Sequence, residues 1–445
     1  MKKKQIKKHM MKVLFAAVMV SGLSVYISCN RNDTAQLHAP TAIVQLQNQS
    51  GTSFNYEVFF EPIVEFHGSA FPANILSTAT MNSLWDGSPR METTDYYIGD
   101  RLGDFGVTLS LKGSSGGTIP VRIEIEGDRF IRKSGLDAVV PLNREIEIFP
   151  RIAYDYQALE RLTQPAVENV YFRLFYGSVP LLEKMEVVSF HSVNEVPFRV
   201  TNRRDGSVMD YTWLFAAYVN EDDPLIDEIL KEALQIGTAE KIGFSRSDVV
   251  FDGYQREVNG DSSLAVDLQV MALWSVFLNR NIKYSSITTT STENSNIFTQ
   301  YVRTLGESLT HSQANCVDGS VLFASVLRKI GIHPFLVIIP GHMFLAYLQD
   351  DEPFSMGFLE TTMMGNTDVQ RYTRDDSFFG RVKRFTGLGQ TQSTATRDSF
   401  LAAKAVGDNL FDEVREKILD EEDTDHILLD ISALRSAGVM PIRRY

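Results

Sequence analysis

The chain has 445 residues, which is too long for one typical domain, so we expect two or more folded units. Its composition is 44% hydrophobic and 22% charged, values typical of a globular protein with a proper core. The formal net charge is −13 at pH 7. Without the six lysines of the first 28 residues, 37 basic and 56 acidic residues remain, a net charge of −19. This balance argues against nucleic acid, or an anionic lipid surface, as a broad partner.

The first 28 residues are predicted to be a targeting segment and not part of the fold. They combine a lysine-rich start with an apolar run at Val13–Val20. The pair Ser28-Cys29 then resembles the lipobox of bacterial lipoproteins, in which a small residue precedes the lipid-modified cysteine. We therefore expect a signal peptide over 1–28 and lipid on Cys29. An ordinary signal peptide with a chance cysteine, or an uncleaved anchor helix, are the alternatives.

Lipid on Cys29 would anchor the chain in the cell envelope, on the outer membrane, facing the periplasm or the exterior. Cys316 would then be the only thiol left, so no intramolecular disulfide is possible. An unpaired thiol in an exported protein is open to oxidation, so its presence suggests either deep burial or use. Free cysteines are often small core residues, which keeps the burial alternative open.

The stretch after Cys29 divides into a tether and a β-rich domain. Residues 29–51 are polar and mixed in composition, which predicts a flexible tether. From 52 to 200 the hydrophobic period is two, for example at Val121, Ile123 and Ile125, with turn signals between short segments. This pattern predicts an antiparallel β-sandwich with a binding or spacer role. His67 and His191 have no ligand-spaced partners there and are interpreted as ordinary structural or surface residues.

From about 210 the period becomes helical, which predicts an α+β domain over 210–445. Asp223-Pro224 begins an amphipathic helix, and a second helix carries Trp274, interpreted as a core residue. Residues from 366 to about 398 are predicted to be a surface excursion. Strands are expected at 335–339, 343–347 and 357–360, a long helix at 399–418, and a late strand at 427–431.

The segment from Asn315 to Gly319 carries the strongest chemical signal. It places Cys316 at a loop-to-helix junction, and the helix is expected to stop at Ile330-Gly331. A thiol in the first turn of a helix faces unpaired backbone N–H groups and the positive end of the dipole. Both favour the thiolate, which is the nucleophilic form.

A histidine and an acid follow this cysteine on strand-like segments. His342 lies 26 residues after Cys316, and Glu360 lies 18 residues further on. Cysteine, histidine and an acid form a nucleophile, base and orienter set. The backbone N–H of Cys316, with Gln300 or Asn315, is the candidate oxyanion hole, although Gln300 is equally readable as a surface glutamine. No metal site and no cofactor are expected.

Residues from about 210 to 365, with a core at 260–365, resemble the bacterial transglutaminase-like superfamily. The resemblance implies a papain-like fold in which Cys316 is the nucleophile, His342 the base and Glu360 the orienter. The residues that carry it are Leu273-Trp274, Ile282-Lys283-Tyr284, Gln300, Arg303, Glu307, Asn315-Cys316-Val317-Asp318-Gly319, Leu327-Arg328-Lys329-Ile330-Gly331-Ile332, Gly341-His342 and Glu360.

Two functions follow from these patterns. The first is a cysteine peptidase or amidase that forms a thioester with a protein or peptide substrate, including cell-wall peptides. Water would then give hydrolysis and an amine would give transamidation. Hydrolysis is favoured because excluding water demands a special acceptor tunnel. The second is a non-catalytic binding or structural lipoprotein on the same scaffold, because a fold does not imply a function.

Overall fold

The computed structural model contains both helices and strands, which confirms the mixed α+β class. Its chain forms two compact units, the N-terminal unit (Val25–Leu214 with Thr290–Gln300) and the C-terminal unit (Phe215–Thr289 with Tyr301–Arg443). The residues that the structure describes are 41–47, 53–81, 91–93, 96–100, 102–114, 116–239, 251–258, 260–285, 294–350, 355–364 and 392–443.

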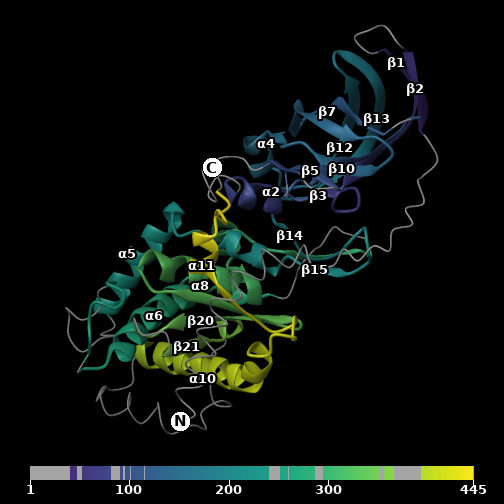
Figure 1. The fold of residues 1–445 in the computed structure, drawn as a ribbon. Helices are drawn as coiled ribbons and strands as arrows, with labels where there is room; N and C mark the ends of the chain where they lie inside the picture. The colour runs from purple at the N-terminus through teal and green to yellow at the C-terminus, as the bar shows by residue number, and fades with distance from the viewer. Residues whose placement is uncertain are drawn as a thin grey trace. The chain divides into compact units, whose positions relative to one another are not determined.

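Two sheets make up most of the N-terminal unit (Figure 1). The first has the strand order β1-β2-β6-β10-β5-β4 and the second has the order β3-β13-β12-β7-β9. The smaller sheets are β11-β8 and β15-β14-β17. The strands and short helices of this unit are β1 Ala42–Gln47, β2 Ser53–Val64, β3 Ser69–Ala70, α2 Pro72–Thr78, β4 Met91–Thr93, β5 Tyr97–Asp100, β6 Phe105–Lys112, β7 Thr118–Gly127, β8 Ile131–Arg132, β9 Ser134–Pro141, β10 Glu145–Phe149, β11 Ala153–Tyr154, α4 Tyr156–Glu160, β12 Ala166–Tyr176, β13 Val179–Phe190, β14 Glu195–Thr201, β15 Val208–Asp210 and β17 Ile297–Tyr301.

The two large sheets share an aromatic core. The ring of Phe105 on β6 lies 6.3 Å from that of Phe190 on β13, and Phe130 lies 4.7 Å from Phe190. The sequence predicts antiparallel pairing throughout, and this is wrong at two places. Strand β10 pairs with β5 in parallel, and β13 pairs with β3 in parallel. These partners are far apart in the chain, so long connections replace the hairpins that would enforce antiparallel pairing.

The expected tether over 29–51 contains a strand and needs correction. β1 occupies Ala42–Gln47 and pairs with β2 from Ala42↔Val58 to Gln47↔Ser53. Exposure alternates along β1: Ile43 and Gln45 are exposed, whereas Ala42 and Val44 are partly buried and Leu46 is buried, so the segment suits a sheet with one covered face. The predicted signal peptide and Cys29 lie outside the described residues.

The C-terminal unit combines a four-stranded sheet with helices (Figure 1). The sheet order is β21-β20-β19-β22, all antiparallel, and β16 pairs in parallel with β18. The segment η2 Thr212–Tyr218 spans the boundary between the units. The elements that follow it are α5 Pro224–Ala239, α6 Ser262–Asn279, β16 Lys283–Tyr284, α7 Leu305–His311, β18 Gln313–Ala314, α8 Cys316–Lys329, β19 Pro334–Ile339, β20 His342–Leu348, β21 Met356–Leu359, η3 Thr361–Met363, α10 Gln392–Ile418, β22 Ile427–Asp430 and α11 Ile431–Ser436.

In Figure 1 the sheet of the C-terminal unit runs between α8 and α10. Phe411 of α10 stacks on Phe358 of β21 with ring centroids 3.9 Å apart, within a cluster that includes Phe344 and Phe335. Burial of such side chains contributes about 1.5–3 kcal/mol each. The long helix α10 is thereby fixed against the strand that leads into Glu360.

The helix α6 forms the centre of the unit, and Trp274 on it is fully buried, as the sequence predicts. Its indole N–H donates to Ser399 Oγ of α10 at 3.2 Å. Among the described helices, α6 is a candidate membrane span by length and composition, but 67% of it is buried inside the fold. That burial fits a core helix.

The sequence predicts one boundary between the domains, near residue 210, but the structure has a second exchange of chain between the two units. Residues Thr290–Gln300 return to the N-terminal unit. The reason is β17, which joins β14 as the third strand of its sheet. Backbone pairing with β14 thus assigns this segment to the N-terminal unit, although it lies between residues of the C-terminal unit in the chain. The hydrophobic period of the sequence does not predict this pairing.

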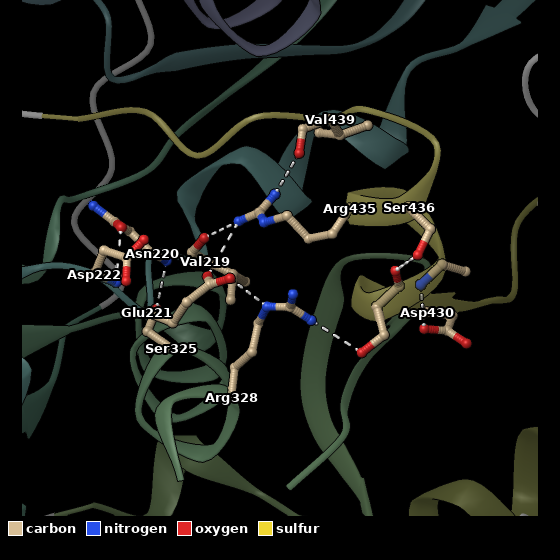
Figure 2. A network of polar contacts seen from close by, with 12 residues as sticks. Val219, Asn220, Glu221, Asp222, Ser325, Arg328, Asp430, Arg435, Ser436 and Val439 are labelled. Atoms are coloured by element: carbon tan, nitrogen blue, oxygen red, sulfur yellow. Dashed lines mark hydrogen bonds and ion pairs between the residues drawn. The ribbon is translucent and has the colours of Figure 1, made fainter. Parts of the chain in front are cut away.

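A network of charged side chains fixes the far end of α8 (Figure 2). Arg328 at that end donates to Glu221 Oε1 at 2.5 Å and to Ser432 Oγ of α11 at 3.0 Å. Arg435 of α11 donates to the backbone oxygens of Val219 and Val439. Burial lowers the pKa of Arg435, and the nearby Glu221 opposes that shift. The helix that begins with Cys316 is therefore anchored at its other end.

Candidate active site

A capping box defines the start of α8. Asn315 is the N-cap, and its Oδ1 accepts the Asp318 N–H at 2.8 Å, while Asp318 Oδ2 accepts the Asn315 N–H at 3.0 Å. Reciprocal bonds of this kind satisfy two of the unpaired donors at a helix start. Cys316 is therefore the first residue of the helix, as the sequence predicts. It forms no disulfide and is partly exposed.

Asp318 also binds the partly exposed Arg303. Arg303 donates its backbone N–H to Oδ1 at 2.8 Å and its Nη1 to Oδ2 at 2.7 Å. Burial raises the pKa of Asp318, and the hydrogen bonds from Asn315 and Arg303 oppose that rise. A buried carboxylate needs such partners, because an unpaired one is strongly destabilising. The pair ties the loop before α7 to the first turn of α8.

His342 owes its position to a tight hairpin between β19 and β20. Ile339 pairs with His342, so only Pro340 and Gly341 form the loop. Gly341 has φ of +75°, a conformation that glycine adopts without steric cost. Proline followed by such a glycine suits a two-residue turn. His342 is thus the first residue of β20, at the turn end of this internal strand.

Glu360 binds His342 directly. His342 Nε2 lies 2.6 Å from Glu360 Oε2, with the histidine side chain 26% exposed and the glutamate side chain 4% exposed. The other carboxylate oxygen accepts the backbone N–H and the hydroxyl of Thr362 at 2.9 and 2.6 Å. The Glu360 N–H donates to Ala403 O of α10 at 3.1 Å. Hydrogen bonds therefore hold both carboxylate oxygens and the backbone N–H of Glu360.

His342 also forms a hydrogen bond with the Cys316 side chain. Burial lowers the pKa of His342, but the bonds to Cys316 and Glu360, with their negative charges, outweigh it and raise the pKa to about 10. Because Nε2 faces Glu360, Nδ1 is the atom left for the thiol. The imidazole therefore lies between sulfur and carboxylate, and it keeps its proton at neutral pH.

A close helix contact fixes the acid relative to the cysteine. A Cβ added at Gly319 would lie 2.8 Å from Thr361 Oγ1 and 3.0 Å from Met364 Cε. Thr361 Oγ1 also lies 3.3 Å from Ser320 Oγ. Glycine at 319 thus lets the first turn of α8 touch the segment directly after Glu360.

The two oxyanion candidates lie in different places. Asn315 adjoins Cys316, but its Oδ1 is engaged in the cap, and its buried Nδ2 has no hydrogen-bond partner among the described residues. Gln300 is on β17 and belongs to the N-terminal unit, whereas Cys316 belongs to the C-terminal unit.

Sequence reasoning missed the roles of two residues near this site. Thr362 binds Glu360, which caps a short helix; glutamate is not among the preferred N-cap residues, so the sequence held no clear signal for this contact. Tyr284 carries a phenol on which the charges of Cys316 and Glu360 both act. In the sequence, Tyr284 is only one of the residues that carry the family resemblance, and a two-residue strand is too short to show a hydrophobic period.

No group of three or more histidine, cysteine or acidic side chains in the described part of the chain has the arrangement of a metal site. No family model matches the chain, and no curated protein matches it either. The function must therefore be argued from the site itself.

Proposed function

We propose that this protein is a thiol enzyme that hydrolyses amide or peptide bonds through Cys316, His342 and Glu360. The observation that carries the proposal is the shared imidazole. It hydrogen-bonds the Cys316 side chain and lies 2.6 Å from Glu360 Oε2. The resemblance to the bacterial transglutaminase-like superfamily, with its papain-like core, supports the same assignment. Histidine between a thiol and a carboxylate is the arrangement that activates a cysteine nucleophile.

Acylation begins with attack of the Cys316 thiolate on the substrate carbonyl carbon. A carbon–sulfur bond forms and the carbonyl π pair moves to oxygen. The pair then returns, the carbon–nitrogen bond breaks, and His342 gives its proton to the leaving nitrogen. The products are a free amine and a thioester on Cys316. The carboxylate of Glu360 stabilises the imidazolium before this step and holds the ring in one orientation.

Deacylation uses the neutral imidazole that the first step leaves. His342 takes a proton from water, the oxygen attacks the thioester carbon, and the carbon–sulfur bond breaks to release a carboxylic acid and the thiolate. An amine in place of water would give transamidation. The first-turn N–H of Cys316 is available to a developing oxyanion, with Asn315 or Gln300 as the predicted second donor.

The proposal is tested by incubating the full chain with a defined peptide library, including cell-wall peptides, in ¹⁸O-labelled water with a fluorescent primary amine. Mass spectrometry then identifies the products. Hydrolysis predicts new carboxyl ends that carry ¹⁸O, and cross-linking predicts the amine on the acyl fragment. Products from the wild type and none from Cys316→Ser are expected. Equal products from both would leave a non-catalytic binding or structural protein.

We also propose that the protein is a lipoprotein of the cell envelope, anchored through lipid on Cys29 on the outer membrane, at its periplasmic or outer surface. The lysine-rich start, the apolar run and Ser28-Cys29 support this proposal. Labelling with a fatty-acid analogue should mark the wild type and not Cys29→Ala. Equal labelling of the two would contradict it.

A further inference from the structure

Tyr284 lies directly beside the segment that leads into Cys316. It pairs in parallel register with Ala314, two residues before the cysteine. Hydrogen bonds flank it on both sides, from Lys283 N–H to Ser312 O and from Ser285 N–H to Ala314 O, each at 3.0 Å. The backbone of Tyr284 is therefore fixed relative to the start of α8.

The same residue adjoins the acid side of the site. β16 lies beside η3, the short helix that Glu360 caps. The Tyr284 side chain is 47% exposed, whereas Ile282 before it is fully buried. Among the described residues its hydroxyl has no hydrogen-bond partner. Tyr284 is therefore a half-exposed tyrosine on a segment whose backbone adjoins both the approach to Cys316 and the short helix that Glu360 caps.

The charges around Tyr284 keep it a hydrogen-bond donor. Burial raises the pKa of Tyr284, and the negative charges of Cys316 and Glu360 raise it further. The phenol consequently stays protonated over the pH range in which a thiolate attacks carbonyl groups. When the Cys316 thiolate adds to a carbonyl group, its negative charge moves to the carbonyl oxygen, and a protonated phenol near that oxygen can donate a hydrogen bond to it.

The side chain of Asn315 fits this role less well. Its Oδ1 accepts the Asp318 N–H, and its Nδ2 is buried away from solvent. The Cys316 backbone N–H needs a second donor to enclose an oxyanion, and Tyr284 offers an exposed one.

We propose that Tyr284 is a further catalytic residue, whose hydroxyl donates a hydrogen bond to the substrate carbonyl oxygen as Cys316 adds to the carbonyl carbon. This inference rests on the proposed function. In each tetrahedral intermediate the oxygen gains the π pair, and the Tyr284 O–H and the Cys316 N–H hold that charge. The tyrosine keeps its proton throughout, so it takes no part in the proton transfers of His342.

A short glycine-based peptide aldehyde tests this role in the full chain. The Cys316 sulfur adds to the aldehyde carbon, and the carbonyl oxygen becomes the negatively charged oxygen of a hemithioacetal. Iodoacetamide also consumes the thiolate, but by displacement of iodide, so no oxyanion forms. Aldehyde affinity is measured as protection of Cys316 against iodoacetamide, and the alkylation rate is measured alone.

Tyr284→Phe should weaken aldehyde protection about tenfold, the effect of one lost hydrogen bond, and leave the alkylation rate within about twofold. Tyr156→Phe, which removes a hydroxyl from a half-exposed tyrosine of the N-terminal unit, is the matched control and should change neither quantity. Unchanged protection in Tyr284→Phe, with loss only in Tyr284→Ala, would assign the role to the ring and overturn the proposal. If wild-type Cys316 reacts with iodoacetamide no faster than an ordinary cysteine, the proposed function itself fails.

Discussion

A histidine–glutamate contact of 2.6 Å occurs in both units, and the surroundings of the two pairs differ. In the N-terminal unit His191 Nδ1 meets Glu195 Oε2, both side chains are buried, and the imidazole stacks on Phe71 at 4.3 Å. In the C-terminal unit His342 is partly exposed and also hydrogen-bonds the Cys316 side chain. A short histidine–carboxylate contact therefore indicates a reactive site only where the imidazole also meets a nucleophile that substrate can approach.

The largest expected effect separates the two pairs by activity. Cys316→Ser should lower hydrolysis of any peptide that the wild type cleaves by about a thousandfold or more, because a serine hydroxyl lacks the thiolate character that the imidazole sustains. Circular dichroism should show an unchanged fold, since the substitution removes no large side chain. His191→Gln is the control and should keep most of the activity. Wild-type rates in Cys316→Ser would contradict the site.

The next effect separates the pairs by stability. His191→Ala should lower the free energy of unfolding by about 3 kcal/mol, because it leaves Glu195 buried beside a cavity. The alkylation rate of Cys316 should be unaffected. His342→Ala should slow alkylation, because the Cys316 side chain loses its imidazole partner. Urea denaturation measures the stability, and alkylation kinetics measure the reactivity of Cys316. If both variants changed stability and alkylation rate equally, the two histidine–glutamate pairs would not differ in role.

Glu360→Gln sharpens the role of the acid. The amide keeps the size of the side chain but does not stabilise a positive imidazole. We expect hydrolysis to fall about a hundredfold while staying above the Cys316→Ser level. Glu195→Gln is the matched control in the other pair and should leave the rate within about twofold. A rate in Glu360→Gln equal to that of the wild type would remove the acid from the mechanism.

Gly319→Ala tests how the acid is held against α8. The added Cβ would crowd Thr361 Oγ1 at 2.8 Å, so Thr361 and the adjoining Glu360 must shift. Overpacking of this kind costs about 1–3 kcal/mol of stability. Gly177→Ala, on an exposed turn with nothing near the added Cβ, is a partial control for the effect of a methyl group, although its positive φ adds local strain. Full stability and full activity in Gly319→Ala would show that the contact is not needed.

The last prediction concerns the pH dependence of stability that comes from His342. Its pKa rises from 6.5 in the unfolded chain to about 10 in the fold. The stabilisation that this shift provides is fully present below pH 6.5 and is lost as the pH rises towards 10. The difference in unfolding free energy between wild type and His342→Gln should therefore shrink over this window. A difference that stays constant from pH 6 to 10 would contradict the charged imidazole.

The local parts of this site could be predicted from sequence because local chemistry determines them. Asn315 and Asp318 show the helix start that carries Cys316, and Pro340-Gly341 shows the turn before His342. Long-range pairing could not be predicted. The return of β17 to β14 placed Gln300 in the N-terminal unit, and the parallel pairing of β16 with β18 placed Tyr284 beside Ala314, two residues before Cys316. Two-residue strands carry no hydrophobic period, so the sequence holds no signal for the second pairing.

In the N-terminal region the sequence analysis failed to predict a strand. Polar composition over 29–51 predicts a tether, although alternate apolar residues at Ala42, Val44 and Leu46 suit a strand. Average composition conceals such a short alternation. Pairing with β2 then decides the structure of the segment.

The most direct test of the account is the rate of Cys316 alkylation by iodoacetamide between pH 5 and 10, in the wild type and in His342→Ala. An imidazolium beside the sulfur predicts fast alkylation at pH 6 in the wild type, and a rate in His342→Ala that rises only at alkaline pH, as for an ordinary cysteine. If the wild type and His342→Ala give the same alkaline profile, then Cys316 and His342 do not act together, and the thiol enzyme proposed here is wrong.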